Sequence, residues 1–394
     1  MVKFYVGISP DEVRSTELEY VLSQTKVMDI KELIRRLGVP VKKSLRKDDL
    51  CMALTDYLRS HPECIVDKMG ADEVLLTQRL LKGESVKGDT RVLFEFYLII
   101  RLGWAALREI HDGSEECEVI LLEEAEHLLR PLVEGLQISM PRKIARFVQS
   151  WSALCGALPI KRVVDYMRRL PEFEGVDSVA VRNSIDAYCN PNDLMYKPIY
   201  DKGRGDDVFM TPWWRVTDSQ IPIECDTVSS EGVTKRVNVY DPVEFSYDKV
   251  MAASMPLFAP ATPNVKERTA LEKLLKDFGM NEIAIESAIL GFWIEKQQDK
   301  DNSNPSSIQS IFRFLKDLND YRTVMFAVTD YMNTIPFWRF GGRSSYEILM
   351  KKTGGVEENQ RSVREYYLKE SESRRMRMPT NAEVAARMTY NPYA

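Results

Sequence analysis

Residues 29–58 read DIKELIRRLGVPVKKSLRKDDLCMALTDYL, and this stretch has the clearest local pattern in the chain. Its apolar residues recur at helical spacing in two groups, which are Ile30, Leu33, Ile34 and Leu37, then Leu50, Ala53, Leu54, Tyr57 and Leu58. Gly38 follows the first group, where a glycine commonly ends a helix. The pattern predicts two short helices that face each other across a loop.

The predicted loop, residues 39–47, is basic, and we call it the elbow. The elbow contains Lys42, Lys43, Arg46 and Lys47, and Arg36 lies just before it at the end of the first helix. Lys and Arg side chains contact phosphate, whereas the neighbouring Asp48 and Asp49 weaken the positive field. Two interpretations remain open: contact with nucleic acid, or a solvated connection with a structural or protein-docking role.

The segment Leu37-Gly38-Val39, the basic elbow and the run Leu45-Arg46-Lys47-Asp48-Asp49-Leu50 together resemble the SAP and Rho-N-terminal-like modules. In that family the elbow meets nucleic acid. The resemblance therefore implies nucleic-acid contact at the elbow cations of this chain.

Length and composition set limits on the rest. A chain of 394 residues is long enough for several domains, and 44% hydrophobic with 29% charged residues is typical of globular protein. The net charge of -5 and the pI of about 5.6 argue against a protein that coats nucleic acid indiscriminately. Any such binding must come from local basic patches.

The sequence predicts a cytoplasmic protein with no membrane span. Met1–Gly7 lacks the apolar core of a signal peptide, and Ser9-Pro10-Asp11-Glu12 is typical of a helix start. The most apolar run, Val92–Leu102, is too short to cross a bilayer. Six scattered cysteines without a C-x-x-C motif and only three histidines predict reduced thiols, no metal site and no cofactor.

The predicted fold class is mainly α with small β-hairpins, an α+β fold. We expect five segments, which are an N-terminal helical region with the hairpin (1–65), a winged-helix-like unit (70–137), a second winged-helix-like unit with a strand pair (141–255), a C-terminal helical bundle (264–355) and a charged helical tail (356–394). Helices followed by a β-hairpin favour the winged-helix interpretation in both units.

The two winged-helix-like units differ in charge. In the first, we expect one apolar helix over Thr90–Leu102 and a hairpin of residues 104–110 and 117–122 whose tip holds Asp112, Glu115 and Glu116, so it should not bind DNA. In the second, we expect helices over 142–155, 161–170 and 177–188, a turn at 156–159, and strands over 194–200 and 208–216. There Arg182, Lys202 and Arg204 form a second candidate nucleic-acid surface, with partner docking as the alternative.

The C-terminal part predicts helices over 265–278, 282–297 and 322–332, another that begins at Pro305, and a capping box at Ser344 to Glu347. Residues 151–159 and 331–347 resemble a poorly characterised group of bacterial SEC-C-associated proteins. No cysteine or histidine lies after Cys225, so the zinc ligands of the SEC-C motif are absent. This resemblance therefore implies an architecture and neither an activity nor a metal.

From the sequence we expect a nucleic-acid-binding protein, bacterial or phage-borne, that acts through local basic patches rather than as an enzyme. The alternative is a protein interaction scaffold. An enzyme is the third class, because no nucleophile with its base, no phosphate-binding glycine loop and no metal-spaced carboxylates are visible. The sequence does not distinguish DNA from RNA.

Overall fold

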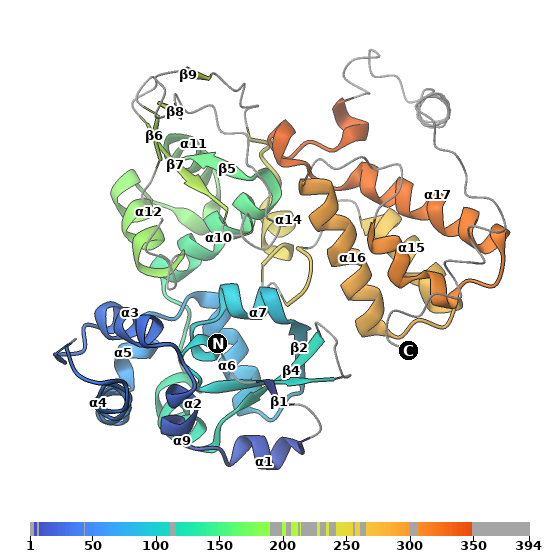
Figure 1. Cartoon of the computed structure of the whole chain (residues 1–394). Coiled ribbons are helices and arrows are strands. Elements are labelled where there is room, and N and C mark those ends of the chain that lie inside the picture. The colour runs from blue at the N-terminus through green and yellow to red at the C-terminus, as the bar shows by residue number, and fades with distance from the viewer. Residues whose placement is uncertain are drawn as a thin grey trace. The chain divides into compact units, whose positions relative to one another are not determined.

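The computed structural model describes residues 4–5, 8–42, 44–110, 116–189, 199–201, 206–211, 213, 227–228, 234–235, 242–254, 257–260, 265–298 and 306–348. The chain is mainly helical with small antiparallel strand pairs, which confirms the α+β prediction. It divides into two compact units (Figure 1). The first unit holds residues 1–149, 171–197 and 254–258, and the second holds 150–170, 198–253 and 259–394.

The first unit contains β1 (Phe4–Tyr5), α1 (Pro10–Arg14), α2 (Leu18–Ser23), α3 (Val27–Leu37), α4 (Lys47–Ser60), α5 (Glu63–Val66), α6 (Ala71–Leu81), β2 (Val86–Asp89), α7 (Thr90–Phe96), α8 (Leu98–Arg101), β3 (Ala105–Glu109), β4 (Glu116–Leu121), α9 (Glu123–Val133), a 3-10 turn (Pro171–Phe173) and α12 (Ser178–Ser184) with a π-helical turn (Ile185–Cys189). α1 begins at the predicted site, where Ser9 and Glu12 form a capping box.

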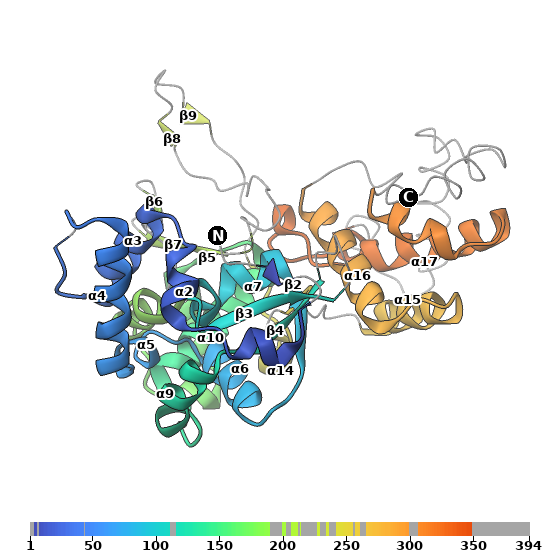
Figure 2. The ribbon, with the colours of Figure 1, turned by 60° about the horizontal axis from the view of Figure 1, so that its bottom comes forward.

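The sheet of the first unit has the order β1-β3-β4-β2, and Figure 2 labels its strands β3, β4 and β2. β3 and β4 form the predicted antiparallel hairpin, with Leu107 opposite Val119. Two strands were not predicted: β2, which pairs antiparallel with β4, and the two-residue β1, which pairs parallel with β3. Strands this short carry too few residues for an alternating pattern, so their pairing depends on contacts distant in sequence.

The prediction of one continuous helix over Thr90–Leu102 is wrong, because the helix breaks at Tyr97. Tyr97 has extended backbone angles, φ -120° and ψ 116°, and separates α7 from α8. A carboxyl oxygen of Glu73, on α6, accepts the N–H of Ile99 at 2.7 Å and so caps the start of α8. Apolar periodicity alone cannot show a cap that comes from another helix.

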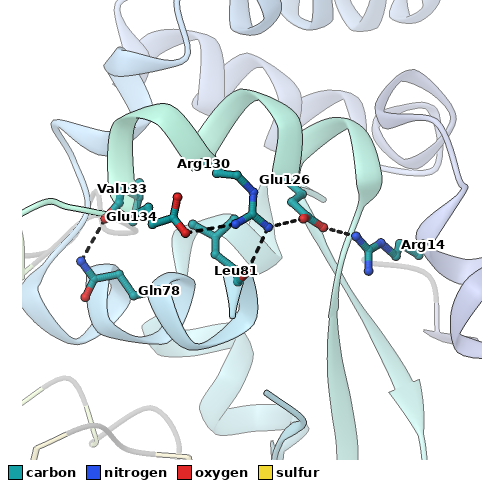
Figure 3. Close-up of polar contacts among 7 residues, drawn as sticks. All are labelled: Arg14, Gln78, Leu81, Glu126, Arg130, Val133 and Glu134. Carbon is teal, nitrogen blue, oxygen red and sulfur yellow. Dashed lines mark hydrogen bonds and ion pairs between the residues drawn. The ribbon is translucent and has the colours of Figure 1, made fainter. Parts of the chain in front are cut away.

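An ionic network on α9 fixes the N-terminal helices to the rest of the first unit (Figure 3). Glu126 accepts hydrogen bonds from Arg14 of α1 and from Arg130. Arg130 also reaches the carbonyl of Leu81 at 3.0 Å, at the end of α6. Carboxylates in the first turn of α9 also lie at the positive end of its helix dipole, which stabilises them further.

The second unit contains β5 (Ala157–Pro159), α11 (Ile160–Met167), β6 (Ile199–Asp201), β7 (Asp206–Met210), β8 (Thr227–Val228), β9 (Thr234–Lys235), α14 (Tyr247–Ala252), α15 (Val265–Asp277), α16 (Glu282–Gln297), α17 (Leu318–Thr334) and 3-10 turns at Ser306–Ser310, Phe312–Phe314 and Trp338–Phe340. The remaining helix, α10 (Met140–Cys155), has its last six residues in this unit. α15, α16 and α17 lie side by side (Figures 1 and 2).

Three further predictions, for residues 157–159, 177–188 and the segment after Pro305, are corrected. Residues 157–159 form strand β5 rather than a turn, because they pair with β7, and the sheet order is β5-β7-β6. The helix predicted over 177–188 is α-helical only from Ser178 to Ser184, and residues Ile185–Cys189 form a π-helical turn. The helix predicted from Pro305 is instead two 3-10 turns, although the apolar residues that defined it are buried, namely Ile308, Ile311, Phe312 and Leu315.

The two stretches that carry the second resemblance contact each other inside the second unit. The indole N–H of Trp338 donates to the carbonyl of Ala153 at 2.8 Å. Gly156 has a left-handed φ of +83°, and a Cβ there would lie 2.7 Å from Trp338, so only glycine fits. The predicted capping box is confirmed, with Glu347 donating its N–H to the Ser344 hydroxyl at 3.2 Å and accepting the Ser344 N–H at 2.6 Å.

Two segments of the chain share one order of elements. α6, β2, α7, α8, β3 and β4 follow the order helix, strand, two helices and two strands, and so do α10, β5, α11, α12, β6 and β7. In both, the first strand pairs with the last one. The winged-helix interpretation of these segments and the five-segment division stay predictions. The tail, residues 356–394, lies outside the described residues.

Candidate nucleic-acid interface

The hairpin of α3 and α4 positions the elbow. α3 ends at Gly38, which has a left-handed φ of 66°, and the N–H of the next residue, Val39, donates to the carbonyl of Ile34 at 3.0 Å. Val39 is buried. The chain then reaches the start of α4 at Lys47.

The two helices of the hairpin have a buried apolar interface. All four predicted side chains of α3 and three of those of α4 are at most 7% exposed, namely Ile30, Leu33, Ile34, Leu37, Leu50, Leu54 and Leu58. Burying each side chain stabilises the fold by about 1.5 to 3 kcal/mol. This interface gives the elbow a defined position between two packed helices.

A second contact holds the hairpin against α9. Arg59, near the end of α4, donates to the carboxylate of Glu124, which also accepts the N–H of Leu18 at 3.3 Å. The hydrogen bond from Arg59 lowers the pKa of Glu124, so this carboxylate stays charged at neutral pH. The hairpin is therefore tied to the sheet-bearing part of the first unit by an ion pair.

The elbow cations divide into two kinds. Lys42 and Arg46 are exposed to solvent. Lys47 is partly buried, and its ammonium donates to the carbonyl of Ser23 at the end of α2. Burial raises the pKa of the nearby Cys51 thiol, and the charge of Lys47 acts against that rise. Lys47 therefore has an internal structural contact, which sets it apart from the two exposed cations.

The start of α4 has mixed charge. Arg46 is its N-cap residue and makes no side-chain cap hydrogen bond, and Asp48 and Asp49 follow in the first turn. These carboxylates stabilise the positive end of the helix. The same carboxylates would repel an anion near this end of the helix.

The other predicted site residues are spread over the chain. Arg182 is exposed on α12, a helix whose start is capped by Asp177. Lys43, Lys202, Arg204 and the side chain of Arg36 lie outside the described residues. Lys42 and Arg46 thus lie in the connection between α3 and α4 and Lys47 at the first position of α4, whereas Arg182 lies on a separate helix.

Two sets of exposed cations were missed from the sequence. Lys26 is exposed at the N-cap of α3, and four more exposed cations lie on α11 and the turn that follows it, namely Lys161, Arg162, Arg168 and Arg169. The signal for α11 was present, because these cations occupy the positions between the apolar residues that predicted the helix.

Among the described residues there is neither a cluster of metal-ligating side chains nor a membrane-spanning helix. No group of three His, Cys, Asp or Glu side chains is placed to hold a metal ion among these residues. No described helix combines the length and apolar character needed to cross a membrane. Comparisons with protein-family models, curated proteins and solved structures found no match to this chain.

Proposed function

We propose that this protein binds nucleic acid and that the elbow contacts the phosphate backbone. The observation that carries the proposal is the exposure of Lys42 within the loop and of Arg46 at its end, where α4 begins, in a loop held by two packed helices. Lys and Arg at such positions give affinity with little sequence information. The resemblance of Leu37 to Leu50 to SAP and Rho-N-terminal-like modules supports the same site.

The proposal assigns different roles to the cations named from the sequence. Lys42 and Arg46 contact phosphate, with Lys43 as a third candidate from its place in the same loop. Lys47 positions the start of α4 through its hydrogen bond to Ser23. Arg182, Lys202 and Arg204 belong to a second candidate surface, and the winged-helix interpretation is part of the proposal for that surface.

Fluorescence anisotropy tests the elbow. Labelled single-stranded RNA, single-stranded DNA and duplex DNA are titrated with the full chain and with the Lys42→Gln/Arg46→Gln variant at several salt concentrations. Loss of two phosphate contacts should reduce the slope of log K against log salt by about 1.4 for a single strand or about 1.8 for a duplex.

The matched control is Lys82→Gln/Lys87→Gln, which removes the same charge from exposed positions of the first unit. We expect the control to keep the slope of the unsubstituted protein. Equal slopes for the elbow variant and this control would remove the elbow as the site. No salt-dependent binding to any of the three probes would overturn the proposed function.

A second candidate function, a protein interaction scaffold, rests on a different observation. Three large apolar side chains of the N-terminal helices are exposed: Tyr20 by 44%, Met28 by 81% and Met52 by 50%. Exposed methionines are common at protein-docking surfaces. A scaffold should retain a defined protein partner after nuclease treatment, and Met28→Glu/Met52→Glu should release it.

A further inference from the structure

α11 is strongly divided into a buried face and a charged face. Its buried side chains pack against β5 and β7 and are Ile160, Val163, Val164, Tyr166 and Met167. The helical turn continues past Met167, because the N–H of Arg168 donates to the carbonyl of Val164 at 3.0 Å. Arg168 and Arg169 therefore continue the helical surface that carries Lys161 and Arg162.

The charged face spans about 120° of the helix circumference at 100° per residue. Its exposed residues are Lys161, Arg162, Asp165, Arg168 and Arg169, four cations and one carboxylate. Arg169 forms an ion pair with Glu244 at 2.6 Å, and its guanidinium lies 5.3 Å from the ring centre of Tyr166. We call Lys161, Arg162, Arg168 and Arg169 the α11 cations.

This concentration of positive charge stands out in a chain with a net charge of -5. Asp165 lies on the same face and Glu244 pairs with Arg169, and the four exposed cations outnumber these two carboxylates, which favours an anionic partner. Lys161 and Arg168 are separated by seven residues, or about 10.5 Å of helix rise, which allows contact with more than one phosphate. Among the residues that the structure describes, no aromatic side chain is exposed on the charged face, since Tyr166 is buried.

We propose that the α11 cations are a further phosphate-contacting surface, additional to the elbow and to the one predicted from Arg182, Lys202 and Arg204, and that its partner is the backbone of a nucleic-acid duplex. A single strand is bound through stacking of its bases on aromatic side chains together with phosphate contacts, and this face offers only the second. A helix that presents cations without base-stacking groups fits the regular phosphate array of a duplex. The inference rests on the proposed function, because it requires that the protein binds nucleic acid.

The test uses the full chain, a labelled mixed-sequence DNA duplex and the Lys161→Gln/Arg168→Gln variant. Gln keeps good helix propensity, and Arg169 is left in place to preserve its ion pair with Glu244. We expect the salt slope to fall by about 1.8 and the affinity to fall by at least fivefold at low salt.

The matched control is Lys273→Gln/Lys276→Gln, which removes two exposed cations from α15 in the same unit. We expect the control to stay within twofold of the unsubstituted protein, and equal thermal unfolding must show that both variants are folded. An α11 variant that matches this control overturns the inference. Equal competition by a single strand of the same length would overturn the duplex assignment.

The elbow variant Lys42→Gln/Arg46→Gln in the same assay separates the two proposals. Weakened binding of the α11 variant alone would refute the elbow and support the inference. Weakened binding of the elbow variant alone would do the opposite. An unsubstituted protein that shows no salt-dependent binding to the duplex would overturn the inference, and the single-stranded probes would then decide the proposed function.

Discussion

Two carboxylates, one inside each unit, are held in different ways. Glu73 on α6 is 2% exposed and meets backbone N–H groups, with Ile99 at 2.7 Å. Glu286 on α16 meets a cation, because Arg268 donates to both of its oxygens at 2.8 and 2.9 Å. One carboxylate serves as a helix cap, and the other is half of an ion pair between α15 and α16.

The two groups show how different partners oppose the effect of burial on the pKa of a carboxyl group. Burial raises the pKa of Glu73 to about 8, and its hydrogen bonds to Ile99 and Leu98 only partly oppose this rise. Burial also raises the pKa of Glu286, where the charge of Arg268 opposes it. Glu73 is therefore largely protonated at neutral pH, and it caps α8 mainly as a neutral acid.

The largest expected effect is a pH dependence of stability that arises from Glu73. Its folded-state pKa of about 8 lies above its ordinary value of 4.5, so the folded state binds the proton more tightly. The stabilisation is complete below pH 4.5 and is lost as pH rises through 8, by up to on the order of 5 kcal/mol. Urea unfolding at pH 5, 6.5 and 8 measures it.

Glu73→Gln provides the comparison, because Gln keeps a carbonyl oxygen for Ile99 and does not titrate. We expect its free energy of unfolding to change much less with pH than that of the unsubstituted protein. Glu123→Gln, at an exposed position of α9, is the matched control and should leave the pH dependence unchanged. A Glu73→Gln protein with the unsubstituted pH profile would contradict the assignment.

A smaller effect is expected when the ion pair of the second unit is broken. Arg268→Leu leaves Glu286 and Glu272 without their shared cation, and Glu272 lies 2.6 Å from Arg268. These side chains retain some solvent contact, so we expect a loss of about 2 kcal/mol in the free energy of unfolding.

The double variant Arg268→Leu/Glu286→Leu sharpens the test of this pair. Removing both partners should recover part of the lost stability, because the less exposed carboxylate, Glu286, is then gone and only Glu272 is left beside an apolar side chain. Thermal and urea unfolding of the single and double variants measure the recovery. A double variant no more stable than Arg268→Leu would show that packing, rather than charge pairing, accounts for the effect.

The parts of the fold that were predicted correctly depend on local pattern. α3, α4, α15 and α16 follow from apolar spacing and from the glycine or polar residues at their ends. The failures depend on distant partners. The break at Tyr97 needs Glu73, and strand β5 needs β7, so neither is visible within a short window of sequence.

The candidate site was predictable to a similar degree. The position of the elbow follows from two helix patterns and Gly38, and the exposure of Lys42 and Arg46 agrees with their place in the loop. The separate role of Lys47 was not predictable, because its partner, the carbonyl of Ser23, belongs to a preceding helix. Sequence shows where charge is concentrated, whereas the fold decides which charges face inward.

Lys47 supplies the smallest expected effect and extends the comparison to a cation that meets a backbone carbonyl. Lys47→Met keeps a long side chain but removes the donor to Ser23, so we expect a loss of about 1 kcal/mol in the free energy of unfolding. The slope of log K against log salt for nucleic-acid binding by this variant should match that of the unsubstituted protein. Lys42→Gln/Arg46→Gln should show the opposite result, with a reduced slope and unchanged unfolding. If Lys47→Met instead reduced the slope and left stability unchanged, its ammonium would have to leave Ser23 to meet phosphate, and the division of the elbow into structural and binding cations would be wrong.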